Sequence, residues 1–69
     1  MNFRIEFERE QDGRRLAEIP ELPGVLDYGA SQNEAMGKAE ILALRVLAER
    51  LENGEIGPVN LTISVPAAA

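Results

Sequence analysis

Polar and apolar residues alternate along the start of the chain, MNFRIEFERE. Phe3, Ile5 and Phe7 occupy every second position, and Arg4 and Glu6 stand between them. A period of two is typical of a β-strand that buries one face. The sequence therefore predicts a first strand here, with its three large apolar side chains on the same side.

The first strand is expected to form a hairpin with residues 15–19, because Asp12-Gly13 between them is a turn signal. A two-residue loop would place Phe7 opposite Glu18 and mix the two faces of the hairpin. A longer loop or a bulge that pairs Phe7 with Ile19 keeps the apolar side chains together. We predict this second register.

Two prolines and two glycines punctuate the segment AEIPELPGVLDYG, residues 17–29. Pro20 lacks an amide donor and should end the second strand. Pro23-Gly24 is expected at the centre of a tight turn in which Gly24 takes a positive φ. Residues 25–29 are then the third strand.

One long helical pattern follows, from about residue 32 to residue 53. Ser31 and Glu34 form an S-x-x-E capping box at its start, and Gly54 suits a left-handed cap at its end. At 100° per residue the helix has one broad apolar stripe that should cover the sheet. The stripe contains Ala35, Met36, Ala39, Leu42, Ala43, Val46 and Leu47.

Further aliphatic residues of the helix lie outside this stripe, and two interpretations of them stay open. Scattered surface aliphatic residues are normal in monomeric proteins. A continuous apolar surface on so short a chain also favours contact with a second chain. We predict an oligomer interface on the helix at Ile41, Leu44, Ala48 and Leu51.

The segment VNLTISV, residues 59–65, alternates cleanly and predicts a last strand. A right-handed crossover through the helix would place this strand beside the first strand and parallel to it. The expected fold class is α+β with element order β-β-β-α-β: an antiparallel three-stranded meander, a parallel fourth strand in the order 3-2-1-4, and one helix packed on one face. The fourth strand would be an uncharged edge, so Ile63 and Val65 are added to the predicted oligomer interface.

The composition argues against several kinds of catalytic and metal-binding site. The 69 residues form one domain at most and contain neither cysteine nor histidine, which argues against disulfides, thiolate metal sites and a histidine base. The order of elements is similar to the front half of the ribonuclease H fold, whose metal-binding carboxylates come partly from its fourth strand. Residues 59–65 contain no acid, so a metal-dependent nuclease is disfavoured. We expect no catalytic residue, no metal site, no cofactor and no enzymatic activity.

The net charge of −5 disfavours contact with nucleic-acid phosphates and suits a basic protein partner, although such a charge also serves solubility alone. No segment has the pattern of a signal peptide or the length of a membrane span. The expected location is the cytoplasm.

The Asp12-Gly13 turn, the IPELPG segment at residues 19–24 and the serine-capped helix with NEAMGKA resemble the HicB-like antitoxin family. The similarity extends over about residues 3–53. It implies a partial ribonuclease H-like fold without nuclease activity, in the antitoxin half of a type II toxin–antitoxin pair. The implied partner is a HicA-like toxin, a small basic protein that cleaves mRNA, and the antitoxin inhibits it by covering its active site.

Antitoxins of this family commonly carry a C-terminal DNA-binding segment, and the present sequence departs from that pattern. We therefore expect a single HicB-like domain over residues 1–69, with no separate DNA-binding domain and no direct DNA binding. Toxin neutralisation remains the leading hypothesis. The alternative is a stand-alone oligomeric adaptor or structural protein that has no toxin partner.

The proline-rich connector is either a stiff link between strands or part of a binding surface. In the second interpretation its rigidity lowers the entropy lost on binding, and a tyrosine supplies an aromatic anchor on an acidic face. The predicted partner-binding residues are Glu18, Glu21, Leu22, Asp27 and Tyr28.

Overall fold

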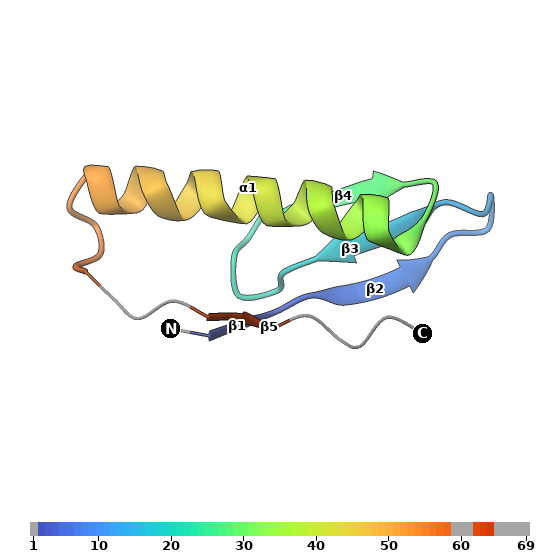
Figure 1. Cartoon of the computed structure of the whole chain (residues 1–69), viewed down its shortest axis with the longest axis horizontal. Helices are drawn as coiled ribbons and strands as arrows, with labels where there is room; N and C mark the ends of the chain where they lie inside the picture. The colour runs from blue at the N-terminus through green and yellow to red at the C-terminus, as the bar shows by residue number, and fades with distance from the viewer. Residues whose placement is uncertain (1, 59–61, 65–69) are drawn as a thin grey trace.

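The structure is a computed structural model that describes residues 2–58 and 62–64. Its elements are β1 (Asn2–Arg4), β2 (Glu6–Arg9), β3 (Arg15–Glu18), β4 (Leu26–Gly29), α1 (Gln32–Glu52) and β5 (Thr62–Ser64). The three strands β2, β3 and β4 form an antiparallel sheet in that order. The long helix α1 packs against one face of this sheet (Figure 1). The predicted α+β class, with a three-stranded meander followed by one helix, is confirmed.

The other two strands form a separate two-stranded sheet. β5 pairs with β1 in parallel, with Phe3 opposite Ile63. The predicted first strand is divided, because Ile5 lies between β1 and β2 and belongs to neither. One continuous four-stranded sheet in the order 3-2-1-4 is not shown. Within the predicted strand over residues 59–65, the structure shows β5 at Thr62–Ser64, and 59–61 and 65 lie outside the described residues.

The β2–β3 hairpin corrects the predicted register. Its connection is longer than two residues, as expected, but Phe7 lies opposite Ala17 and not opposite Ile19. The amide of Glu10 donates to the carbonyl of Arg14 at 2.8 Å, and Gly13 takes a φ of 90°. The loop therefore shifts the pairing by two residues. A shift of two preserves the faces, so Phe7 and Ala17 still point to the same side of the sheet.

The proline-rich connector is a pair of consecutive turns. The amide of Leu22 donates to the carbonyl of Ile19, and the amide of Val25 donates to the carbonyl of Leu22. Gly24 has a φ of 85°, which fits the third position of a type II turn and confirms the predicted Pro23-Gly24 geometry. The side chains of Ile19, Leu22 and Val25 are buried, so the connector is fixed to the core at three points.

The core lies between α1 and the strands, and small residues bring the helix close to the sheet. Gly29 of β4 is buried, and a Cβ added to it would lie 2.5 Å from the amide nitrogen of Ala35. The predicted apolar stripe of α1 is confirmed: four of its residues are buried, and Met36, Leu42 and Val46 pack against the cluster. The buried residues are Phe3, Ile5, Ala17, Ile19, Leu22, Val25, Ala35, Ala39, Ala43 and Leu47.

Both ends of α1 are capped as the sequence predicts. The Ser31 hydroxyl accepts from the Glu34 amide at 3.1 Å. The Glu34 carboxylate reaches back to the amide of Ala30, one residue earlier than in the standard capping box. At the other end Gly54 has a φ of 71°, and the amides of Gly54 and Glu55 donate to the carbonyls of Leu51 and Arg50. These two bonds make a Schellman motif, which ends the helix at Glu52.

Candidate protein-binding surface

The face of the three-stranded sheet that points away from α1 carries two rows of side chains. Residues directly opposite one another on antiparallel strands point to the same side. Phe7, Ala17 and Gly29 point toward the helix, so the alternate positions point away from it. The two rows are Glu6, Glu18 and Leu26, and Glu8, Leu16 and Tyr28. We call these six residues the open sheet face.

The open sheet face has apolar and acidic residues beside each other. Leu16 and Tyr28 lie opposite each other and are half-buried. Leu26 is 40% exposed, which is high for a leucine within a sheet. Glu6, Glu8 and Glu18 supply three carboxylates to this face, and the Arg14 guanidinium from the hairpin loop lies against Tyr28. A partly apolar strand pair next to three negative charges matches a partner surface that combines cations with apolar contact.

Arg14 restrains the aromatic ring of this face. The Cζ atom of its guanidinium lies 4.5 Å from the centre of the Tyr28 ring, in a cation–π contact. Its Nε donates to the Asp12 carboxylate at 2.7 Å, and its amide donates to the same carboxylate at 3.0 Å. The amide hydrogen bond, followed by the side-chain hydrogen bond and charge of Arg14, lowers the pKa of Asp12 below its ordinary value of 3.8. The hairpin loop thus holds a cation over Tyr28 through an ionised Asp12.

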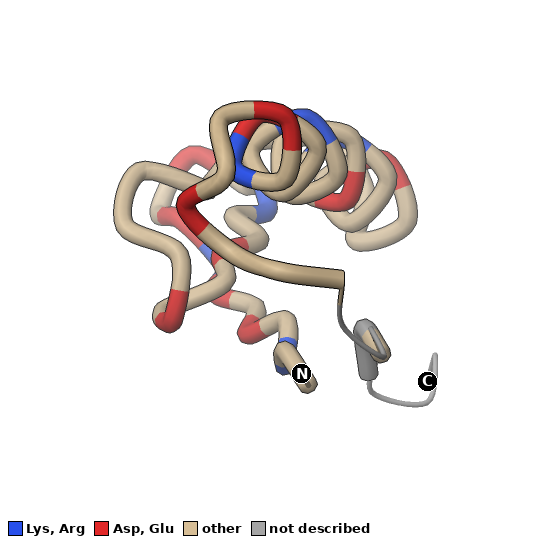
Figure 2. The backbone as a smooth tube through the Cα atoms, turned by 90° about the vertical axis from the view of Figure 1, so that its left-hand side faces the viewer, with Lys and Arg blue, Asp and Glu red and all other residues tan. Residues whose placement is uncertain are grey.

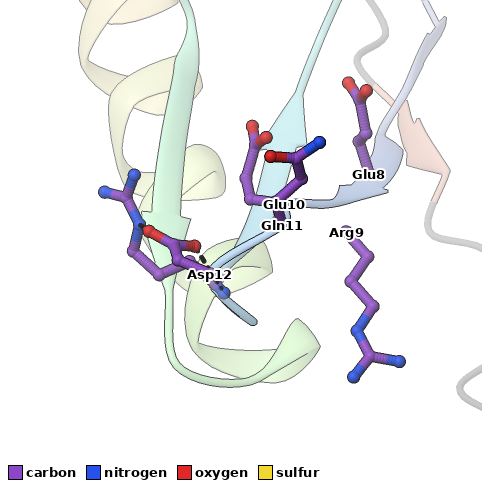
Figure 3. Close-up of a pocket in the computed structure, with 6 residues that line it drawn as sticks. Glu8, Arg9, Glu10, Gln11 and Asp12 are labelled. Atoms are coloured by element: carbon purple, nitrogen blue, oxygen red, sulfur yellow. Dashed lines mark hydrogen bonds and ion pairs between the residues drawn. The ribbon is translucent and has the colours of Figure 1, made fainter.

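The tip of the β2–β3 hairpin forms an open depression (Figure 3). It is lined by Glu8, Arg9, Glu10, Gln11, Asp12 and Arg14. The side chains of Glu8 and Arg9 extend to opposite sides of the strand, as expected for neighbours in β2. Glu8 therefore belongs both to this depression and to the open sheet face, so the acidic surface continues onto the hairpin tip.

The outer edge of β4 has its outward amides satisfied locally. The Ile19 amide donates to the Val25 carbonyl, so residues 25, 27 and 29 are the ones that hydrogen-bond toward β3, as every second residue does in an antiparallel pair. The amides of Leu26 and Tyr28 therefore point away from β3. The Tyr28 amide donates to Asp27 Oδ1 at 2.7 Å, and the Leu26 amide donates to the Gly24 carbonyl at 3.2 Å. An added strand would have to break both bonds. The geometry favours docking of a partner on the face of the sheet rather than along this edge.

The predicted partner-binding residues are only partly brought together. Glu18 and Tyr28 both lie on the open sheet face. Glu21 is exposed in the connector. Asp27 is opposite Ala17 and therefore points to the helix side of the sheet. Leu22 is 1% exposed, which corrects its prediction as a contact residue, because the double turn directs this side chain into the core.

The sequence interpretation missed four residues of this face: Glu6, Glu8, Leu16 and Leu26. The signal that identifies them is the period-two alternation of the strands, once Phe7 and Ala17 are assigned to the helix side. Leu16 and Leu26 are apolar, so their residue type alone does not distinguish a place on this face from a place in the core. The structure assigns them to the opposite face, which α1 does not cover.

The predicted oligomer interface maps to the outer surface of α1. Ile41 and Leu44 are each 51% exposed, Leu51 is 44% exposed, and Ala48 is also exposed. Ile63 is in β5, but its side chain is outside the description, and Val65 lies outside the described residues. The described part of the interface is therefore confined to the helix and lies away from the open sheet face.

Residues 2–58 and 62–64 contain no group of three or more acidic, cysteine or histidine side chains placed to hold a metal ion. Within the same residues, no helix combines the length and the apolar character that crossing a bilayer requires. No protein-family model, no curated protein and no solved structure matches the chain.

Proposed function

We propose that the chain is a non-enzymatic, antitoxin-like binding protein that neutralises a small basic HicA-type toxin by covering the toxin's RNA-cleaving surface. The observation that supports this proposal most strongly is the open sheet face. It presents Leu26 and Tyr28 next to the carboxylates of Glu6, Glu8 and Glu18 on a rigid strand scaffold. A toxin that binds RNA presents cations, which complement these carboxylates.

Charge supports the same partner at longer range. The chain has a net charge of −5, and acidic segments occur on the strands and loops beneath the helix as well as on the helix itself (Figure 2). Opposite fields accelerate the encounter of two proteins. Tyr28 is held by Arg14, so its ring loses little freedom when a partner binds. We expect binding in the cytoplasm without a cofactor.

The finer fold that goes with this function is a partial ribonuclease H-like domain. Only Ile5 separates β1 from β2, and β5 pairs with β1 in parallel. We propose that β1 and β2 act as one bent strand, which gives a mixed sheet in the order 3-2-1-4 of the predicted strands. Deuterium exchange of the β1 and β5 amides tests this arrangement, because a paired parallel strand would slow their exchange.

The function is tested by co-expression with the small basic protein encoded beside this chain. The neighbour alone should arrest growth, and the wild-type chain should restore it. A chain carrying both Glu8→Lys and Glu18→Lys should bind the neighbour at least about 10-fold more weakly, because two attractive charges become repulsive. Its binding should also depend less on salt than wild-type binding does.

The matched control carries Glu49→Lys and Glu55→Lys, which change the net charge equally at exposed positions away from the open sheet face. It should retain wild-type rescue apart from a small salt-dependent loss. Equal losses in the two variants would mean that only net charge matters. A neighbour that stays fully toxic beside the wild-type chain contradicts the antitoxin function.

The second candidate is a stand-alone oligomeric adaptor. It is favoured by one observation, the exposed aliphatic residues on the outer surface of α1. Oligomers in the purified chain together with no interaction with the basic neighbour would support this second function over the first.

A further inference from the structure

The exposed aliphatic residues of α1 follow a strict heptad spacing that includes a glycine. Gly37, Ile41, Leu44, Ala48 and Leu51 are separated by four, three, four and three residues. This is the spacing of the a and d positions of a coiled coil, with Ile41 and Ala48 at a and the other three at d. We call these five residues the outer seam of α1.

The outer seam lies on the side of α1 opposite the core. The buried residues Ala35, Ala39, Ala43 and Leu47 occupy the inner side of the helix. Of the four large aliphatic side chains that are strongly exposed among the described residues, three belong to the seam and the fourth is Leu26. A Cβ added to Gly37 would meet nothing within 4 Å, so this part of the helix surface is uncovered. The helix therefore has a buried apolar face and an exposed one, which come closest together at Leu47 and Leu51.

The charges beside the seam select a second copy of the chain as its occupant. Glu40 and Arg45 stand at g and e positions beside the middle of the seam, and the other flanking positions are Lys38 at e and the buried Leu47 at g. Neither Glu40 nor Arg45 forms an ion pair with another described residue, whereas Lys38 is 3.4 Å from Glu34 in its own helix. In a parallel pair of helices the g position of one chain faces the e position of the next heptad in the other. Two symmetric Glu40–Arg45 pairs would then form between the chains.

The antiparallel alternative is electrostatically worse. The register that places Ile41 against Leu51 of the other copy brings the two Arg45 side chains together at the centre of the interface. Like charges at such a contact oppose association. Gly37 supports the parallel arrangement as well, because two opposed glycines at d allow the helix starts to approach closely while Leu44 and Leu51 supply the apolar contact.

We propose that the chain forms a parallel homodimer through the outer seam of α1, with intermolecular ion pairs between Glu40 and Arg45. The interface is short, about two heptads, so the dimer is weak and depends on concentration. It leaves the open sheet faces of both copies uncovered. Each dimer thus presents two partner-binding surfaces, but the dimer does not depend on the proposed partner.

Sedimentation equilibrium of the wild-type chain from about 1 μM to 1 mM should show the apparent mass rising from one copy toward two. Leu44→Glu places two like charges at the centre of the seam and should keep the chain monomeric over that range. Leu26→Glu changes an exposed leucine on the open sheet face and should dimerise like the wild type. Both variants should keep the wild-type circular dichroism spectrum, since both leucines are exposed.

Two further variants test the orientation. Glu40→Arg and Arg45→Glu should each weaken the homodimer about 3- to 10-fold, and an equal mixture of the two should form a heterodimer that is tighter than either. Because the chain contains no cysteine, Gly37→Cys introduces a single thiol. Oxidation should link two copies of this variant, since a parallel pair places the two thiols opposite each other.

Three results would overturn the proposal. The wild-type chain stays monomeric at 1 mM, or the dimer persists in Leu44→Glu, or Gly37→Cys dimerises without forming a disulfide under oxidation. The last result would indicate an antiparallel pair, in which the two thiols lie near opposite ends of the interface.

Discussion

Gly29 of β4 and Ala35 of α1 pack backbone against backbone. A Cβ at position 29 would come within 2.5 Å of the Ala35 amide nitrogen and 3.0 Å of the Glu34 carbonyl carbon. This contact fixes the first turn of the helix on the sheet, and the rest of α1 extends from that point along the core (Figure 1). The positions of the open sheet face and of the outer seam depend on it, because it sets which side of α1 and which side of the sheet face outward.

Replacing Gly29 should therefore destabilise the fold. Gly29→Ala forces the helix start away from β4, and backbone atoms yield less readily than a flexible side chain. The free energy of unfolding in urea should fall by about 2–3 kcal/mol. A loss below about 0.5 kcal/mol would show that the first turn of α1 moves without cost.

Gly37→Ala is the matched substitution with the opposite expected sign. The glycine lies within the helix, and a Cβ there meets nothing within 4 Å. The free energy of unfolding should rise by about 0.5–1 kcal/mol, because alanine has the higher helix propensity. The measurement belongs at a few μM, where self-association does not contribute. A decrease in stability would mean that the outer surface of α1 is covered in the isolated chain.

The Ser31 hydroxyl caps the start of α1. Ser31→Ala removes the acceptor that holds the Glu34 amide and should lower the free energy of unfolding by about 1 kcal/mol. Ser31→Asp keeps an acceptor at the helix start and should recover most of that loss. Equal stability of the alanine and aspartate variants would contradict a capping role for the hydroxyl.

Asp12 should make the hairpin tip sensitive to acid. Hydrogen bonds from the Arg14 amide and side chain lower the pKa of Asp12 in the folded chain. Its contribution to stability is therefore fully present above the ordinary value of 3.8 and is lost as the pH falls through the lower folded value. The Arg14 amide shift, followed by NMR, should titrate with a midpoint below 3.8, and this transition should vanish in Asp12→Asn. A midpoint at or above 3.8 would contradict the two hydrogen bonds.

Local patterns in the sequence predict most of the described fold. Period-two alternation identifies the strands, and Ser31, Gly54 and the apolar spacing identify the helix within one residue of its observed end at Glu52. The predicted hairpin register was wrong, because Phe7 points to the helix side of the sheet whether it pairs with Ala17 or with Ile19. Only the geometry of the loop decides between these two registers. The predicted single four-stranded sheet is also not shown, because the structure has a two-stranded sheet of β1 and β5 and a three-stranded sheet of β2, β3 and β4.

The residues of the proposed binding surfaces were harder to predict from the sequence than the strands and the helix. Leu22 follows Glu21 in a connector and looked like a surface residue, but the two consecutive turns direct it into the core. Leu16 and Leu26 were given no role from the sequence, and the strand pairing places them on the side of the sheet away from the helix. Faces of a short sheet depend on tertiary packing, so a residue's chemistry alone does not decide whether a partner reaches it.

The proposed function requires the open sheet face to cover a basic partner. Its most direct test is an NMR footprint of the isotopically labelled chain during titration with the small basic protein encoded beside it. Chemical shift changes should centre on Glu8, Leu16, Leu26 and Tyr28, and the signals of Ile41 and Leu44 should be unaffected. Changes confined to the outer seam of α1, or no change at saturating partner concentration, would contradict the proposed function.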